Sequence, residues 1–116
     1  MQAQNIHDAR NACWQCRDTT QDVLVNHCLA MGGEHVQQQH VKLMLDCIEI
    51  TQTCADFLRR ESQQHQQVCQ LCAEVCQACA DSCDQLGGAE MQRCAAACRQ
   101  CADACRSVGQ GQRMAA

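Results

Sequence analysis

Nine cysteines between Cys69 and Cys105 recur at steps of three and four residues, in two runs separated by Gly87 and Gly88. The runs are Cys69, Cys72, Cys76, Cys79 and Cys83, followed by Cys94, Cys98, Cys101 and Cys105. On an α-helix this spacing puts the thiols of each run on one face, within arcs of about 80° and about 60°. Aligned thiols are soft ligands that suit Cu(I), zinc or iron–sulfur clusters. Each run therefore predicts a helix that carries sulfur where a bundle helix normally carries leucine.

Five more cysteines precede these runs, which brings the total to 14 in 116 residues: Cys13, Cys16, Cys28, Cys47 and Cys54. One or two such residues are readily explained as small core hydrophobes, but packing alone gives no reason for sulfur at so many aligned positions. A disulfide scaffold is a second interpretation, although thiols three or four residues apart on one helix are poorly aimed for a bridge. The N-terminus has neither the basic start nor the apolar run of an export signal, so we expect a cytoplasmic protein with metal-binding thiols.

The charge of the ion separates the candidate metals. A zinc ion bound by four thiolates carries a net charge of −2, and several such sites in one core would be very costly without a facing lysine or arginine. Iron–sulfur clusters raise a similar problem, and their cysteines usually lie on loops. One Cu(I) per thiolate is neutral, and bridging thiolates could hold up to about one ion per cysteine. The pattern therefore favours a polynuclear Cu(I) site.

The chain offers four helical segments to position these thiols. It has no proline and is rich in alanine and glutamine, which favour helix. We expect helices over residues 5–31, 34–60, 63–86 and 89–108, with Asn5 and Ser62 as N-caps and a frayed tail from Gly109. Short connections between helices of this length predict an all-α, antiparallel up-down-up-down four-helix bundle with a cysteine-lined core, forming a single domain over residues 1–116.

The first two helices should also turn their sparser thiols inward. Their expected inward residues are Cys13, Cys16, Thr20, Val23, Leu24, Cys28 and Met31, and then His40, Met44, Cys47, Cys54 and Leu58. If neighbouring helices are paired antiparallel about their connections, Cys16 should lie toward the end of the bundle that holds the chain termini. His40, Met44 and Cys47 share one face toward the double-glycine end, where they could form a soft loading site, with Met31 and Met91 nearby. We expect the other histidines (His7, His27, His35 and His65) to lie at the surface and Trp14 to serve packing or a subunit contact.

Composition excludes several other functions. The formal net charge is −4 and no basic cluster is present, which argues against nucleic-acid binding. No apolar segment of about 18 residues could span a membrane. No Cys/His/Asp constellation stands apart from the thiols, so we expect a binding protein and not an enzyme.

The spacing Cys-x2-Cys-x3-Cys-x2-Cys-x3-Cys, followed by Cys-x3-Cys-x2-Cys-x3-Cys, resembles that of the bacterial copper storage proteins, which are cysteine-rich four-helix bundles. The resemblance runs from Cys13 to Cys105. It implies a homotetramer of bundles that each store many Cu(I) ions, and the lack of a leader resembles the cytosolic members. Thr20 and Thr51 stand where this family pattern would allow further thiols, which implies a smaller capacity than that of the richest members.

The sequence therefore predicts a cytosolic Cu(I) storage or sequestration protein, a homo-oligomer to which a copper chaperone could deliver ions. The alternatives are a zinc or general soft-metal buffer and a thiol/disulfide redox protein, which would need exposed thiols of low pKa. The expected metal ligands are Cys13, Cys16, Cys28, Cys47, Cys54, Cys69, Cys72, Cys76, Cys79, Cys83, Cys94, Cys98, Cys101, Cys105, His40 and Met44.

Overall fold

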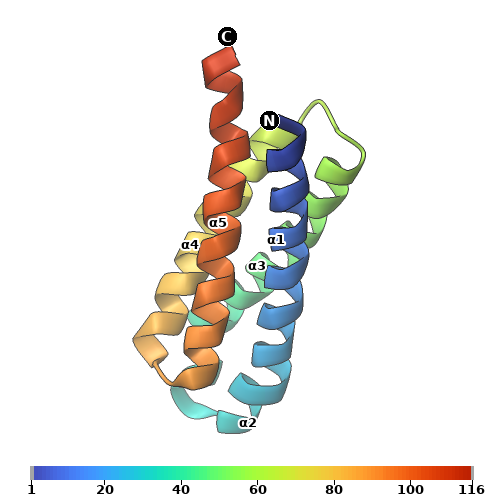
Figure 1. Cartoon of the computed structure of the whole chain (residues 1–116). Helices are drawn as coiled ribbons and strands as arrows, with labels where there is room; N and C mark the ends of the chain where they lie inside the picture. Colours follow the sequence, from blue (N-terminus) through green and yellow to red (C-terminus); the bar gives the residue numbers. More distant parts are fainter. Residues whose placement is uncertain (1, 116) are drawn as a thin grey trace.

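The chain folds into a bundle of four long helices, as expected (Figure 1). The computed structural model describes residues 2–115. Its elements are α1 (Gln2–Val23), the π-helical turn η1 (Leu24–Cys28), α2 (Leu29–Met31), the 3-10 turn η2 (Gly33–Val36), α3 (Gln38–Arg59), α4 (His65–Leu86) and α5 (Ala89–Ala115). The first long helix is therefore α1, η1 and α2 in one continuous rod. The all-α, antiparallel up-down-up-down bundle is confirmed.

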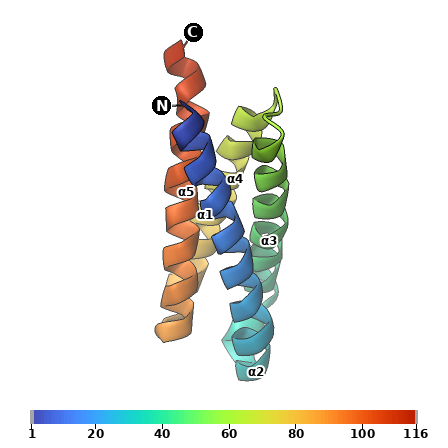
Figure 2. The same cartoon turned by 45° about the vertical axis from the view of Figure 1, so that its right-hand side comes forward.

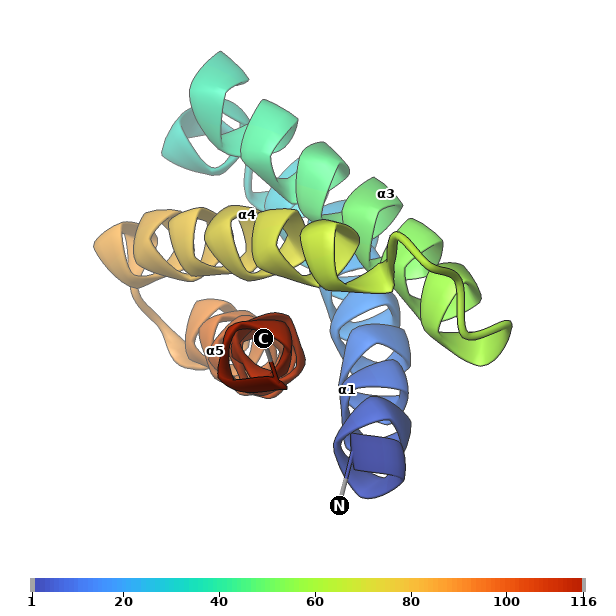
Figure 3. The ribbon, with the colours of Figure 1, turned by 90° about the horizontal axis from the view of Figure 1, so that it is seen from above.

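Each long helix packs against two antiparallel neighbours. In Figures 2 and 3, α1 lies beside α3 and α5, and α4 lies beside the same two helices. The bundle measures 47 × 21 × 21 Å, with both described chain ends at one end and the double-glycine turns at the other. A column of side chains along the long axis is therefore enclosed by all four helices.

The two double-glycine turns end helices where a side chain would be strained. Gly32 and Gly33 have φ values of 68° and 56°, and Gly87 and Gly88 have values of 72° and 92°. Only glycine adopts this left-handed region readily, so each pair stops its helix and reverses the chain.

Helix α5 begins at Ala89 as expected, but the other three long helices start elsewhere. Helix α1 begins at Gln2, so Asn5 lies inside it and is not its cap; the first turn gains instead a hydrogen bond from Gln4 Nε2 to Asp8 Oδ1 (3.0 Å). Helix α3 begins at Gln38, because Gln37 has extended backbone geometry after the 3-10 turn. Helix α4 begins at His65 and not at residue 63, so Ser62 is not its N-cap; the Ser62 Oγ accepts a hydrogen bond from the Gln64 amide (3.1 Å) just before the helix.

The expectation that the chain frays after Val108 was wrong, because α5 continues through Gly109 to Ala115. Gly109 faces α4, where an added Cβ would lie 2.8 Å from Gln70 Cγ. Gln70 Nε2 also donates a hydrogen bond to the Gly109 carbonyl (3.3 Å). The missing side chain thus lets α4 and α5 approach closely at a point where the sequence alone suggests a break.

The π-helical turn η1 corrects the register of the first rod. On a regular helix, Cys28 would lie about 120° around the axis from Cys16 and would leave the inward face. The backbone amide of Leu29 instead donates to the carbonyl of Leu24, five residues earlier, so the turn holds one extra residue. Cys28 consequently returns to the core, where it is fully buried.

The core consists mainly of short side chains. All fourteen cysteines are fully buried, and alanines such as Ala55, Ala80 and Ala102 fill the space between them. The larger buried side chains include Met44, Leu58, Met91 and Val23. Met31 was expected to face inward but is 60% exposed, because α2 packs mainly on the adjoining turns η1 and η2 and not on a facing helix.

Candidate metal centre

The fourteen cysteine sulfurs form a column along the bundle axis, which we call the sulfur column. Helices α4 and α5 supply nine of the sulfurs, and the rod α1–η1 and helix α3 supply the other five. Five groups have all their sulfurs within 4.8 Å of one another: Cys54/Cys69/Cys105, Cys13/Cys72/Cys101/Cys105, Cys16/Cys47/Cys76, Cys47/Cys79/Cys98 and Cys79/Cys83/Cys94. The first two groups share Cys105 and the last three are linked through Cys47 and Cys79. Because Cys72 and Cys76 are 3.8 Å apart and join the two sets, ligands follow one another along the core without a wide gap.

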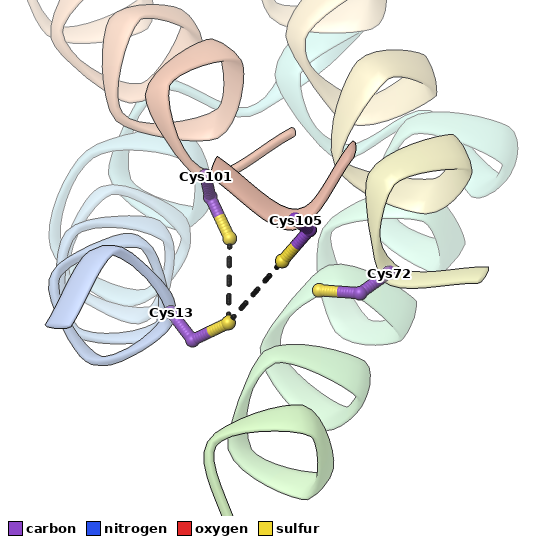
Figure 4. A group of neighbouring side chains, drawn as sticks. All are labelled: Cys13, Cys72, Cys101 and Cys105. Atoms are coloured by element: carbon purple, nitrogen blue, oxygen red, sulfur yellow. Dashed lines mark hydrogen bonds between the residues drawn. The ribbon is translucent and has the colours of Figure 1, made fainter. Parts of the chain in front are cut away.

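The largest group gathers four thiols from three helices near the chain termini (Figure 4). Cys13 extends from α1 toward Cys101 and Cys105 of α5, with sulfur–sulfur distances of 3.6 and 3.7 Å. Cys72 points into the same space from α4. The sulfur of Cys54, from α3, joins this group: it lies 3.6 Å from the sulfur of Cys69 and 4.0 Å from that of Cys105.

The middle of the column is a compact trio of thiols. The sulfurs of Cys16, Cys47 and Cys98 lie 3.6, 3.7 and 3.8 Å apart and come from α1, α3 and α5. Cys16 therefore belongs to the middle of the bundle and not to the terminal end, where the sequence had placed it. The hydroxyl of Thr20 lies against this trio, at 3.7 Å from Cys98.

A chemically different group lies at the double-glycine end, around Cys28. The Cys28 sulfur is 3.7 Å from His40 Nε2, 3.9 Å from Met44 Sδ and 3.8 Å from Met91 Sδ. His40 and Met44 thus meet Cys28 and not Cys47, with which the sequence had grouped them. Ser82 shares a hydrogen bond of 2.8 Å with His40 Nδ1, which leaves Nε2 as the ring nitrogen that faces Cys28.

Burial without a facing cation opposes ionisation of the thiols, whereas contacts between neighbouring thiols shift their individual pKa values in both directions. No lysine or arginine is among the buried residues of the described chain. Burial, followed by the nearby charges of Cys83 and Cys94, raises the pKa of Cys28 to about 11. The neighbouring thiols, Cys101 first among them, raise the pKa of Cys76 far above its ordinary value. Hydrogen bonds with neighbouring thiols, that with Cys16 first, lower the pKa of Cys47 to about 6. Burial lowers the pKa of His40, so that its imidazole is neutral and can act as a ligand.

The cysteines are free thiols. The shortest contacts between their sulfurs are 3.6 Å, whereas a disulfide bond is about 2.0 Å long. Their complete burial also denies them the exposure that thiol/disulfide exchange requires. The arrangement suits metal coordination better than redox cycling.

Polar residues cover the outside of the sulfur column. Arg99 forms ion pairs with Asp81 and Asp84, and Arg106 pairs with Asp103 (3.1 Å), all on the outer surface of α4 and α5. The half-buried ring of Trp14 lies beneath the guanidinium groups of Arg17 and Arg59, at 5.3 and 5.6 Å. This matches the packing role expected for Trp14.

The remaining histidines lie outside the column. His7 contacts Arg10 and Asn11 at the surface, and His65 Nδ1 lies 2.6 Å from the carbonyl oxygen of Ser62. The rings of His27 and His35 meet edge to face, with centroids 5.3 Å apart. Within residues 2–115, no helix combines the length and the apolar character that a membrane crossing needs.

The structure brings all fourteen predicted cysteines, His40 and Met44 into one core, and it gives three further residues a place in the site. Met91, which the sequence analysis placed near the loading site, completes the group around Cys28. Ser82 orients His40, and Thr20, which was expected to face inward, places a hydroxyl among sulfurs. The sequence analysis assigned no role in the site to Ser82 or to the Thr20 hydroxyl.

Comparison with known proteins gives a consistent result. A sequence profile of the family "Copper storage protein" matches residues 2–110. The protein Nmul_A1745 from Nitrosospira multiformis has a similar structure, with a TM-score of 0.87 and 44% identity over 91% of this chain and 95% of that chain. The Cu(I)-bound copper storage protein BsCsp3 has a TM-score of 0.84 and 27% identity over 90% of this chain and 98% of that chain. A mutant of Streptomyces lividans Ccsp has a TM-score of 0.83 and 28% identity over 93% and 95% of the two chains. A search of curated protein sequences found no match.

Proposed function

The chain belongs to the copper storage protein family, and from this premise we propose that it stores many Cu(I) ions per chain in the sulfur column, as a cytoplasmic homotetramer. The observation that carries the proposal is the chain of close sulfur contacts among thirteen buried, free thiols, with Cys28 buried beside them. Copper is the cargo of such a protein, and we assign it a role in storage and not in catalysis.

The thiolates favour Cu(I) through both softness and charge. Thiolate sulfur binds soft cations, and one Cu(I) per thiolate leaves the core neutral. A zinc ion in the group Cys13, Cys72, Cys101 and Cys105 would leave −2 in a core with no buried lysine or arginine among its described residues. The same cost would recur at every further zinc site, which is why a column of this length suits a monovalent ion.

The sixteen predicted ligands, together with Met91, divide into a storage set and a loading set. We propose that the thiols from Cys13 to Cys105 other than Cys28 hold the stored ions, because their neighbours within reach are mostly other thiols. Cys28, His40, Met44 and Met91 form the loading set, since thioethers and a neutral imidazole bind Cu(I) without adding negative charge. Their place beside the double-glycine end gives incoming copper a first ligand set before it reaches Cys83 and Cys94.

The proposed homotetramer needs an outer contact surface, and α3 and α4 offer one. Leu45 and Leu71 are each 51% exposed, and Ile50, Leu71 and Val75 line a shallow groove together with Asp46 and Glu49. Apolar side chains gathered on one face of a chain are typical of protein–protein contacts. Light scattering of the purified protein would measure the mass of the assembly, and a Leu71→Glu variant should shift that mass toward the monomer.

Anaerobic titration of the reduced apoprotein with Cu(I), in competition with a chelator of known affinity, tests the storage function. We expect uptake far above four ions per chain and close to one ion per cysteine. Saturation near three or four ions would instead indicate tetrahedral zinc-type sites and would contradict the proposal. A thiol count well below 14 in freshly purified, unreduced protein would favour the redox alternative.

A paired variant tests the loading set separately from the stored ions. His40→Ala together with Met44→Leu should slow copper uptake in stopped-flow measurements but leave the thiol-bound capacity nearly unchanged. A matched variant at the other end of the column, Cys69→Ala, should lower the capacity without slowing the uptake of the first ion. Equal uptake rates in the wild type, the double variant and Cys69→Ala would contradict the assigned direction of loading.

A further inference from the structure

Thr20 places a hydroxyl group inside the sulfur column. The side chain is fully buried, and its Oγ1 lies 3.6 Å from the sulfur of Cys94 and 3.7 Å from that of Cys98. The sulfurs of Cys16 and Cys47 follow at 3.8 and 4.0 Å. In the described part of the chain, every hydrogen-bonding contact of this hydroxyl is therefore to sulfur, and the sulfurs come from α1, α3 and α5.

Thr51 is a natural comparison, because it is also fully buried and also faces the core from its helix. Its Oγ1 donates to the carbonyl oxygens of Cys47 (2.7 Å) and Ile48 (3.0 Å) on its own helix. The two buried threonines thus differ in one respect: Thr51 is satisfied by oxygen acceptors, whereas Thr20 has only sulfur partners.

This difference makes the hydrogen bonding of Thr20 depend on the state of the thiols. The Cys94 thiol donates to Thr20 Oγ1 at 3.6 Å, and a neutral thiol is both a weak donor and a weak acceptor, so contacts of 3.6–4.0 Å satisfy this buried hydroxyl poorly. The form of cysteine that binds a metal is the thiolate. A charged acceptor makes a shorter hydrogen bond that is roughly twice as strong, so the hydroxyl gains a good partner when copper displaces the thiol protons.

The trio beside Thr20 is where such a donor has the largest effect. Before neighbouring Cu(I) ions share these sulfurs and neutralise them, one Cu(I) held by the three thiolates of Cys16, Cys47 and Cys98 would leave a local charge of −2, and no buried lysine or arginine lies among the described residues to offset it. A hydroxyl aimed at these sulfurs supplies part of the missing compensation.

We propose that Thr20 is a copper-site residue that donates its O–H to metal-bound sulfur of the trio or of Cys94, and so favours the loaded state at the middle of the column. The inference rests on the proposed storage function and adds a residue that is not itself a metal ligand. Thr20 acts on copper through the thiolates, so it is a positioning and charge-compensating residue.

Three variants test this assignment: Thr20→Val, which removes the hydroxyl at nearly constant shape, Thr20→Ser, which keeps it, and Thr51→Val as the matched control. Each is titrated with Cu(I) against a chelator, and each apoprotein is unfolded with urea. Thr20→Val should lower the affinity for about one Cu(I) per chain by about 10-fold to 100-fold with unchanged capacity. Thr20→Ser and Thr51→Val should match the wild type in affinity.

Apoprotein stability separates this role from a structural one. Because the hydroxyl of Thr20 has weak partners before copper binds, Thr20→Val should unfold at the same urea concentration as the wild type or at a higher one. A Thr20→Val protein that loses stability but competes for copper like the wild type would overturn the proposal, as would an equal loss of affinity in Thr51→Val. Failure of the wild type to bind more than four ions would refute the storage function itself, whatever the variants do.

Discussion

Copper loading should release about one proton per ion at neutral pH. The thiols lie in a core without a buried lysine or arginine in its described part, so a set of buried thiolates would have no cation to offset it, and burial raises the pKa of Cys28 to about 11. Each Cu(I) needs a deprotonated ligand, so every ion that occupies a new thiolate must displace a proton. For 14 thiols, complete loading should release up to fourteen protons, and one Cu(I) per displaced proton leaves the charge of the core unchanged.

The count can be measured in weakly buffered, anaerobic protein by adding Cu(I) as a complex of known proton content and following a pH indicator. Calorimetry in two buffers of different ionisation enthalpy gives an independent value. The same coupling makes the apparent affinity for each ion fall about tenfold per unit of decreasing pH, as long as the thiol stays protonated in the apoprotein. The His40→Gln variant is a suitable control, because it changes a ligand that is already neutral and should leave the proton count of the thiols unchanged.

A release well under half a proton per Cu(I) at pH 7 would refute the reasoning. It would mean that most thiols are already ionised in the apoprotein, and the column would then need cations that its buried, described residues do not include. The charge argument that favours Cu(I) over zinc would fail with it.

Three further predictions concern the apoprotein and single side chains. Leu58→Ala should lower the free energy of unfolding by about 2–5 kcal/mol, because Leu58 is among the few large buried side chains. Leu45→Ala, at an exposed site, should change it by no more than about 0.5 kcal/mol. Urea denaturation measures both values, and equal losses would contradict the assigned core. Cys76→Ala should keep the helical circular dichroism and lower the copper capacity by about one or two ions, since its sulfur contacts Cys47 and Cys72 at 3.8 Å; an unchanged capacity would exclude Cys76 as a ligand. Burial lowers the pKa of His40, so its contribution to apoprotein stability is present above its ordinary pKa of 6.5 and is lost as the pH falls through the folded-state value. Stability should therefore decline below about pH 6.5 in the wild type more steeply than in His40→Gln, and parallel pH profiles would contradict this.

The sequence predicted the bundle and the inward direction of its thiols because both depend on helical periodicity. Cysteines at steps of three and four mark a face whatever the neighbouring helices do, and the double-glycine pairs mark the turns. His40 and Met44 were placed correctly on the inward face for the same reason.

The features that escaped prediction depend on backbone detail or on contacts between helices. The π-helical turn inserts a residue without a distinctive residue type, although the angular offset of Cys28 from Cys16 was a usable signal. Gly109 is compatible with either a helix end or a close helix contact, and only the neighbouring Gln70 decides between them. The contrast between Thr20 and Thr51 arises from side-chain rotamers, which composition and spacing do not encode.

Because the interior holds few bulky side chains, the bundle should tolerate smaller core substitutions better than larger ones. Cysteine and alanine are short, so the rods lie close together and there is little spare volume between them. Trimming a cysteine to alanine removes one atom and should be absorbed, whereas enlarging it to leucine or phenylalanine would push the helices apart. An interior of this kind cannot exchange its ligands for larger aliphatic residues one at a time, so the same tight spacing that holds metal also constrains how the chain can evolve away from holding it.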